Sequence, residues 1–370
     1  MKKFIEEKLN GLKLDECWDV HAHLLGIGDS QTSGIYLKRS TGIKKLVENI
    51  RLLVFKHYTK SVKSPTDDTY LNYFIHCAEN SFPGFKSCAF AFTSYHDNNG
   101  VPNDKLSDFV IPNEWSKYAS QKSKSLLYVA SVHPKENNAI EKLIQAKNDG
   151  AIAIKWLPCA HNINPSDESN IPFYKKLVEL KLPLITHAGS EHAVHGEHFN
   201  QNYGNPLLLR LPLNYGVKVI VAHCATDGYD YDFEESHKTV SSFELFARLM
   251  DDPKYNDCIY ADISATPQIN RAKWLPILLE RQDWHHKLLN GSDYPLPAIP
   301  ILFSLRWLKI KGLLTEKDVW SLVKVKKNNP LLFDFLLKRS LCYKGKKFSN
   351  QVFETKRIFD FNNGVYSEYF

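Results

Sequence analysis

Short apolar runs recur along this chain, and stretches with helical spacing of apolar residues separate them. The runs are nearly continuous in apolar residues and do not alternate with polar ones. That pattern is typical of parallel strands covered on both faces. The expected strands are residues 17–20, 85–95, 126–134, 151–158, 183–189, 218–226, 258–266 and 287–295.

The segments between the later runs read as helices. The repeated alternation of strand and helix predicts an α/β protein with a (β/α)₈ TIM barrel, in preference to a doubly wound sheet. No glycine-rich phosphate loop follows an early strand, which weighs against a dinucleotide-binding fold. The expected helices are residues 136–150, 171–182, 205–216, 241–252 and 270–282.

The spacing of the predicted strands is uneven and suggests two additions to a barrel. About residues 27–82 lie between the first two strands and contain a helix-like stretch, 43–60. The last residues, 341–370, are polar with scattered aromatics. We therefore expect a metal-dependent hydrolase barrel over residues 1–340, with a helical insertion at about 27–82, and a C-terminal extension over 341–370.

The composition and charge of the chain limit the kinds of molecule that it is expected to bind. The 370 residues are 43% hydrophobic and 24% charged, and the net charge of +6 forms no basic stripe that would favour nucleic acid. The chain shows no apolar leader and no apolar run of membrane-spanning length. Its seven cysteines form no C-x-x-C pair, which suits a reducing compartment. We predict a cytoplasmic protein that acts on a small molecule without nucleic-acid or membrane partners; homo-oligomerisation is left open.

Polar side chains at the ends of the predicted strands indicate chemistry. In a barrel of this kind, catalytic groups lie at the C-terminal ends of the strands. The stretch "DVHAH" places His21 and His23 on one face of a strand, because alternate residues point the same way. The other polar residues at or near strand ends are His133, Lys155, His187, His223, Asp262 and Asp293.

Histidine nitrogens with a carboxylate are the usual ligands of a catalytic divalent metal ion. Such an ion lowers the pKa of bound water and polarises a substrate oxygen, and a neighbouring histidine can move protons. A single histidine at a strand end is more often structural, and Lys155 could extend past the barrel rim into solvent. The gathering of these residues at the same end of successive strands nevertheless predicts a metal site.

Four motifs, in this order, resemble the amidohydrolase superfamily. They are "DVHAH", "THAGSEH", "VAHC" and "GSDYP", and the resemblance runs from about residue 17 to about residue 335. More narrowly, the chain is similar to the amidohydrolase-related branch, called amidohydrolase family 2, which contains metal-dependent hydrolases and decarboxylases. Each motif alone is weak, and the specificity lies in their combination.

The resemblance implies roles for individual residues. His21, His23, His187 and Asp293 would bind a divalent ion, with zinc as the expected metal, and Asp293 and His223 would act on water or substrate. Lys155 would either be carboxylated and bridge two ions or remain a rim lysine beside one. The resemblance also implies lower-ranked substrate or supporting positions at Glu191, His192 and His133.

The leading interpretation is a metal-dependent hydrolase that uses an activated water on a small-molecule C–N or C–O bond, in an amide, lactone or ester. The alternative is a metal-dependent decarboxylase of an aromatic or unsaturated acid, for which Arg51 could hold the carboxylate. A related deoxyribonuclease is less favoured, because strand four ends in Lys155 and no basic groove is visible. A barrel without activity is disfavoured by the retained set of ligand-type residues.

Overall fold

The computed structural model describes residues 1–28, 33–37, 65–191, 199–299 and 302–359. Its central feature is an eight-stranded parallel sheet in which neighbours follow chain order. The strands are β1 (Trp18–Asp19), β3 (Lys86–Phe90), β5 (Leu126–Ala130), β6 (Ala153–Trp156), β7 (Leu184–Thr186), β8 (Val219–Val221), β11 (Ile259–Asp262) and β12 (Leu288–Leu289).

Backbone hydrogen bonds just beyond β1 and β12 close this sheet on itself. Val20 N–H donates to Asn290 O at 3.0 Å, and Asp293 N–H donates to His21 O at 2.7 Å. A parallel bridge pairs Ala22 with Tyr294. The eight parallel strands and their helices therefore form the (β/α)₈ barrel that the apolar runs predict, and closure brings the first and last strands side by side.

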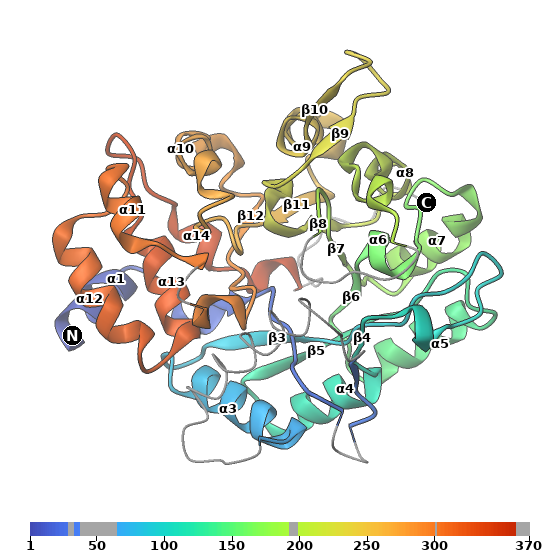
Figure 1. The fold of residues 1–370 in the computed structure, drawn as a ribbon, viewed down its shortest axis with the longest axis horizontal. Helices are drawn as coiled ribbons and strands as arrows, with labels where there is room; N and C mark the ends of the chain where they lie inside the picture. The colour runs from blue at the N-terminus through green and yellow to red at the C-terminus, as the bar shows by residue number, and fades with distance from the viewer. Residues whose placement is uncertain (29–32, 38–64, 192–198, 300–301, 360–370) are drawn as a thin grey trace, which may run out of the picture.

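Helices surround the sheet in Figure 1. The predicted segment 205–216 forms a 3₁₀ turn at Pro206–Leu209 and then a short helix, because Pro212 lacks the N–H that a continuous helix would need there. The helices between strands are α4 (Asn113–Lys122), α5 (Ala139–Asn148), α6 (Pro158–His161), α7 (Ile171–Glu179), α8 (Arg210–Asn214), α9 (Ser242–Asp251) and α10 (Leu275–Glu280).

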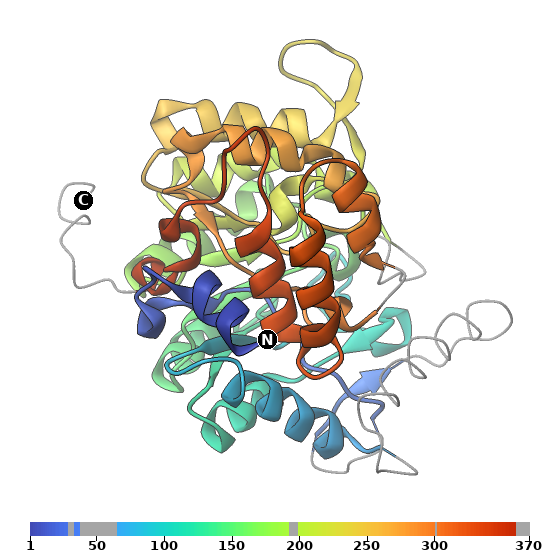
Figure 2. The ribbon, with the colours of Figure 1, turned by 90° about the vertical axis from the view of Figure 1, so that its left-hand side faces the viewer.

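Additional elements lie outside the barrel repeat. Helix α3 (Asp67–Glu79) belongs to the predicted insertion, whereas the predicted helix 43–60 lies outside the described residues. The antiparallel pair β9 (Tyr229–Tyr231) and β10 (Thr239–Ser241) projects from the barrel in Figures 1 and 2. The remaining elements are β2 (Tyr36–Leu37), β4 (Phe109–Val110), α1 (Lys2–Leu9), α11 (Leu305–Ile310), α12 (Glu316–Lys326), α13 (Pro330–Ser340) and α14 (Asn350–Phe353).

The described part of the C-terminal extension packs against the barrel. Asn290 N–H donates to Val352 O at 2.7 Å, and Trp18 stacks on Phe359 with ring centroids 5.9 Å apart. Ile358 joins the apolar cluster inside the barrel, beside residues such as Val20. The extension thus contributes to the barrel core. Among the described helices, none is both long and apolar enough to cross a lipid bilayer.

Candidate metal centre

Three side chains from the first and last strand ends converge on one point. His21 Nε2 lies 3.2 Å from His23 Nε2, and Asp293 Oδ1 lies 3.6 Å and 3.2 Å from these two nitrogens. Ligand atoms about 2.1 Å from a tetrahedral ion are separated by about 3.4 Å. The three atoms therefore have the spacing of one face of such a site, and these side chains could hold a metal ion.

Asp262, at the end of β11, orients the first of these ligands. His21 Nδ1–H donates to Asp262 Oδ2 at 2.8 Å. This hydrogen bond leaves the lone pair of Nε2 directed at the site, as is usual for histidines that bind metals. Burial, with Lys155 nearby, lowers the pKa of His21 to about 4, so the ring is neutral and able to bind a cation.

The same carboxylate organises a second histidine. Asp262 Oδ1 accepts the His223 backbone N–H at 3.1 Å and the Ser264 N–H at 3.0 Å, and it also accepts the Ser264 hydroxyl. Burial alone would raise the pKa of Asp262, but His21 and His223 hold it well below the usual range. Asp262, His21 and His223 form a second group of side chains that could hold a metal ion.

The contacts of His223 define its tautomer. The Ser264 hydroxyl hydrogen is used towards Asp262, so the hydroxyl oxygen, 2.7 Å from His223 Nδ1, acts there as an acceptor. Ser264 O, 3.2 Å away, is also an acceptor. Nδ1 therefore carries the proton, and the Nε2 lone pair faces Asp293 Oδ2 at 3.9 Å. His223 thus presents a proton acceptor to the metal group.

The backbone is strained at both of these rim positions. His223 has φ of 55° and Asp293 has φ of 58°, in the left-handed region that residues other than glycine seldom adopt. Asp293 N–H also donates to the carbonyl of His21, which fixes one ligand relative to the other. Strain of this kind persists where the surrounding structure imposes it, and it is common at functional sites.

Asp19, which the sequence analysis did not single out, joins the two strands that carry the metal group. Its carboxylate accepts the His21 N–H at 3.1 Å, the Ser292 N–H at 2.7 Å and the Ser87 hydroxyl at 3.0 Å. Asp19 is two residues before His21. The alternation of residues along β1, which places both on the same face, is the sequence pattern that could have indicated its role. Its role is to hold β1 and the loop after β12 in register.

Lys155, in β6, is buried. Its Nζ lies 4.9 Å from the centroid of the Phe90 ring, and only 1% of the residue is exposed. Burial lowers the pKa of Lys155 to about 8, although Asp262 and Asp293 act in the opposite direction. The alternative in which Lys155 extends past the rim into solvent does not agree with this burial, since the side chain packs against Phe90. Whether Lys155 bridges two metal ions stays a prediction.

His187 lies next to His223, with ring centroids 5.5 Å apart, and is in neither of the two metal groups. Its Nε2 is 3.2 Å from Ser190 O, and its Nδ1 is 3.4 Å from Glu191 Oε2. Burial is the main cause that lowers the pKa of His187. The structure thus places the predicted Glu191 beside His187, and the metal-binding role of His187 stays a prediction.

His133 lies in a separate histidine cluster. It stacks on His96 with ring centroids 4.1 Å apart, its Nε2–H donates to His161 O at 3.1 Å, and its Nδ1 accepts the Lys135 N–H. Its substrate role therefore stays a prediction without support from the metal group. His192 and Arg51 lie outside the described residues.

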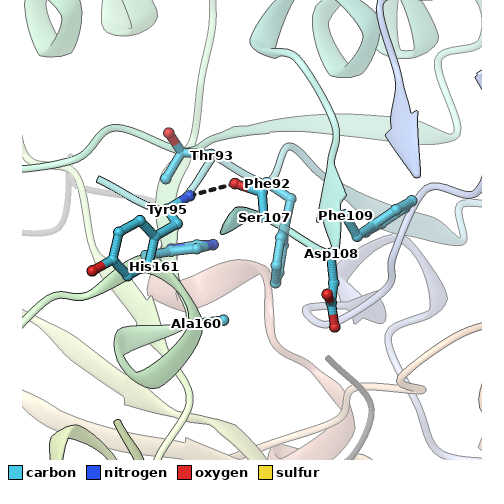
Figure 3. Close-up of a pocket in the computed structure, with 8 residues that line it drawn as sticks. All are labelled: Phe92, Thr93, Tyr95, Ser107, Asp108, Phe109, Ala160 and His161. Atoms are coloured by element: carbon cyan, nitrogen blue, oxygen red, sulfur yellow. Dashed lines mark hydrogen bonds between the residues drawn. The ribbon is translucent and has the colours of Figure 1, made fainter. Parts of the chain in front are cut away.

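A small pocket is lined by residues that include Phe92 and His161, and none of the metal group lines it (Figure 3). The Phe92 ring lies 6.0 Å from the His23 ring and 4.7 Å from the His161 ring, measured between centroids. Tyr95 N–H donates to Ser107 Oγ at 2.8 Å in its wall. The pocket has a volume of about 10 Å³, enough for about one water molecule.

No family model and no curated relative matches this chain. Similar solved structures include a probable 2-pyrone-4,6-dicarboxylic acid hydrolase from Acinetobacter baumannii, with 15% identity, 86% of this chain and 95% of that chain covered, and a TM-score of 0.46. An amidohydrolase II has 17% identity, 86% and 99% coverage, and a TM-score of 0.44. A 2,6-dihydroxybenzoate decarboxylase has 11% identity, 86% and 98% coverage, and a TM-score of 0.44.

We expect Gly291→Ala to displace His21 and reduce metal binding. A Cβ at Gly291 would lie 2.7 Å from His21 Cβ and 3.2 Å from Ser264 Cβ, neither of which can rotate away. Overpacking of this kind costs about 1–3 kcal/mol of folding free energy. Metal analysis and urea unfolding measure both effects. Gly216→Ala is the control for metal content alone. Its φ of +75° makes any side chain strained there, so stability should fall, but its added Cβ meets nothing within 4 Å and the variant should retain its metal.

Metal-free protein should lose stability as the pH falls from about 6.5 to about 4. Burial lowers the pKa of His21 to about 4 and of His133 to about 3, and it also lowers the pKa of His161, His187 and His223. In this window the unfolded chain binds protons on rings that stay neutral when folded. Stability therefore rises with pH and declines towards acid.

Two buried carboxyl groups have the opposite effect on stability as the pH falls. Burial raises the pKa of Asp19 to about 6 and of Asp334 to about 7, so protonation of these groups favours the folded chain at acid pH. The histidines are more numerous, and we expect their effect to dominate. The urea midpoint of chelator-treated protein at about pH 7 and about pH 5 measures the balance; equal midpoints at the two pH values would contradict the expectation.

Proposed function

We propose that this protein is a metal-dependent hydrolase that acts on a C–N or C–O bond of a small molecule, such as an amide, lactone or ester. The observation that supports this most directly is the spacing of His21 Nε2, His23 Nε2 and Asp293 Oδ1. Nitrogen and carboxylate oxygen are suitable donors for zinc, and His21 is kept neutral by burial. A divalent ion held here would activate water and polarise a substrate carbonyl.

The chain's own groups supply proton transfer. Asp293 Oδ2 lies opposite the unprotonated Nε2 of His223, so a proton taken from the attacking water at Asp293 can pass towards His223 or the leaving group. Although burial raises the pKa of Asp293, the three surrounding histidines hold it well below the usual range. Asp293 is therefore ionised at neutral pH, as an acceptor must be. We assign proton transfer to Asp293 and His223.

The proposal is tested by metal-dependent turnover. Purified protein, chelated and then reloaded with Zn²⁺, Mn²⁺ or Mg²⁺, is assayed against an ester, a lactone and an amide: 4-nitrophenyl acetate, dihydrocoumarin and 4-nitroacetanilide. We expect hydrolysis of at least one compound, abolished by the chelator and restored by one metal. Hydrolysis that survives chelation contradicts the proposal. The absence of hydrolysis with every metal, for this panel and for wider sets of esters, lactones and amides, also contradicts it.

Metal content then decides the role of Lys155. We expect about one zinc ion per chain, because the two metal groups share His21 and the Lys155 ammonium lies against Phe90. In that case Lys155→Met should keep the same metal content. Two ions per chain, falling to one in Lys155→Met, would instead indicate a carboxylated lysine that bridges two metals. Elemental mass spectrometry of both proteins distinguishes these outcomes.

A further inference from the structure

The segment that contains helices α11 and α12, residues 305–327, carries most of the net positive charge of the chain. It has seven lysine or arginine residues and two acidic residues, which give it a net charge of +5, whereas all 370 residues together have a net charge of +6. Acidic and apolar residues separate the basic ones along the sequence, so they form no run. We call the exposed side chains of residues 305–327 the α11–α12 face.

Three large apolar side chains protrude from the α11–α12 face. Ile310 is 72% exposed, Trp320 is 64% exposed and Val323 is 43% exposed. Residues three or four positions apart share one face of a helix, so Trp320 and Val323 lie beside Lys324 and Lys327 on α12. A single exposed apolar residue is ordinary on a protein surface. A group of them among lysines indicates a surface that a partner covers.

Ion pairs hold α11, α12 and α1 against one another, so this face is continuous. Lys309 of α11 pairs with Glu316 of α12, and the Glu316 carboxylate also accepts a hydrogen bond from Trp320. Lys317 pairs with Glu7 of α1 at 3.1 Å. The three helices lie together at the left of Figure 1, on the side that faces the viewer in Figure 2.

The remaining charges of the face are available to a partner. Arg306, Lys324 and Lys327 are exposed, and none of them has an ion pair within the part of the chain that the structure describes. A surface with an excess of unpaired positive charge attracts anionic partners. The partner of this face is therefore expected to be negatively charged and to accept apolar side chains as well.

The residue types on the face distinguish between anionic partners. Protein interfaces are depleted in lysine and enriched in arginine, whereas six of the seven basic residues in this segment are lysines. A nucleic acid backbone would contact the lysines but would leave Ile310 and Val323 without apolar partners. An anionic lipid surface matches both features, because its headgroups attract lysines while tryptophan and aliphatic side chains enter the boundary with the acyl chains.

We propose that the α11–α12 face binds the surface of a membrane that contains anionic lipids, with Trp320 and Ile310 inserted at the level of the headgroups. Such binding is peripheral and needs no membrane-spanning helix, on whose absence from the sequence the expectation of no membrane partner was based. The proposal does not depend on the proposed hydrolase function, since none of its residues belongs to either metal group.

Sedimentation of the full chain with sucrose-loaded vesicles measures this binding. The vesicles consist of phosphatidylcholine alone or of phosphatidylcholine with phosphatidylserine, at physiological ionic strength, where attraction between distant charges is screened. The test variants are Trp320→Ala and the double charge reversal Lys324→Glu with Lys327→Glu. All three positions are exposed, and circular dichroism and urea unfolding show whether each variant is folded.

Matched controls make the same chemical changes elsewhere on the surface. Tyr229→Ala removes an aromatic side chain that is 67% exposed on the β9–β10 hairpin. Lys124→Glu with Lys238→Glu reverses two exposed charges outside the α11–α12 face. The second control changes the net charge of the chain by the same amount as the test reversal, so it separates the effect of this face from that of overall charge.

We expect the wild-type protein to bind the phosphatidylserine vesicles at least roughly tenfold more strongly than those of phosphatidylcholine alone. The double reversal at Lys324 and Lys327 should weaken this binding at least roughly tenfold, because each lysine near an anionic surface contributes about fivefold. Trp320→Ala should weaken it roughly tenfold, as buried apolar area is lost. Vesicles should shift the tryptophan emission of the wild type to the blue and shift that of Trp320→Ala less, and both controls should bind as the wild type does.

Equal binding to the two kinds of vesicle would overturn the inference. An equal loss of binding in the test and control reversals would also overturn it, because overall charge would then account for the attraction. Displacement of the protein from vesicles by polyglutamate or duplex DNA, at an equal concentration of charge, would assign the face to a different acidic partner and contradict the lipid assignment. These measurements use no turnover, so none of their outcomes decides the proposed hydrolase function.

Discussion

Replacing both His21 and His23 by alanine is expected to reduce bound metal from about one ion per chain to nearly none while the barrel stays folded. The two Nε2 atoms lie 3.2 Å apart and supply two of the three atoms that converge at the site. Asp293 alone would remain, and one carboxylate holds a divalent ion far more weakly than three ligands do. Elemental mass spectrometry after dialysis measures the loss.

Both rings contact Phe90, with centroids 4.8 Å and 5.3 Å away, but the fold should survive because the apolar cluster inside the barrel is otherwise built from other residues. The apolar cluster inside the barrel contains residues such as Val20 and Phe90 and neither histidine. Asp262 loses its bond to His21 but keeps the N–H groups of His223 and Ser264. We expect a stability loss of about 1–3 kcal/mol, that of one buried hydrogen bond.

The exposed His286 provides the control, because His286→Ala removes an imidazole that belongs to neither metal group and should leave metal content unchanged. Urea unfolding and circular dichroism confirm that each variant is folded. Full metal content in the folded double variant would rule out His21 and His23 as ligands and would place any metal elsewhere.

Hydrophobic patterning was sufficient to predict the barrel. The apolar runs correspond to the eight strands, since a parallel strand that is covered on both faces needs apolar residues throughout. The exact extent of the elements was less predictable. Residues 270–282 read as one helix, whereas the structure has a 3₁₀ turn at Ala272–Trp274 followed by α10.

The convergence of His21, His23 and Asp293 could be expected because the ends of parallel strands in a barrel meet at one rim. The roles of Asp262 and Asp19 could not be predicted from the sequence. The function of each carboxylate depends on which backbone N–H groups and rings face it. For the same reason, periodicity gave no indication that Lys155 is buried against Phe90. Strand order determines which residues meet, whereas side-chain orientation and hydrogen bonding determine their chemistry.

Asp293→Asn is expected to lower turnover about 10²- to 10⁴-fold, the contribution typical of a positioned proton acceptor. The amide keeps the shape of the carboxylate, and asparagine tolerates the left-handed conformation that Asp293 adopts at φ of 58°. The backbone bond to His21 O should therefore persist. What the variant loses is the negative charge that faces three histidines and the oxygen that accepts a proton.

The assay uses whichever panel compound the wild type hydrolyses, at saturating metal, with kcat and metal content measured on the same samples. Saturating metal separates the two roles of Asp293, because weaker binding is then compensated and the remaining loss reports on proton transfer. The exposed Asp283→Asn is the matched control and should retain wild-type kcat, since Asp283 pairs with Arg281 at the surface. If Asp293→Asn kept wild-type kcat with metal bound, the proton acceptor would have to be another group. His223, whose unprotonated Nε2 faces the same site, would then be the first candidate.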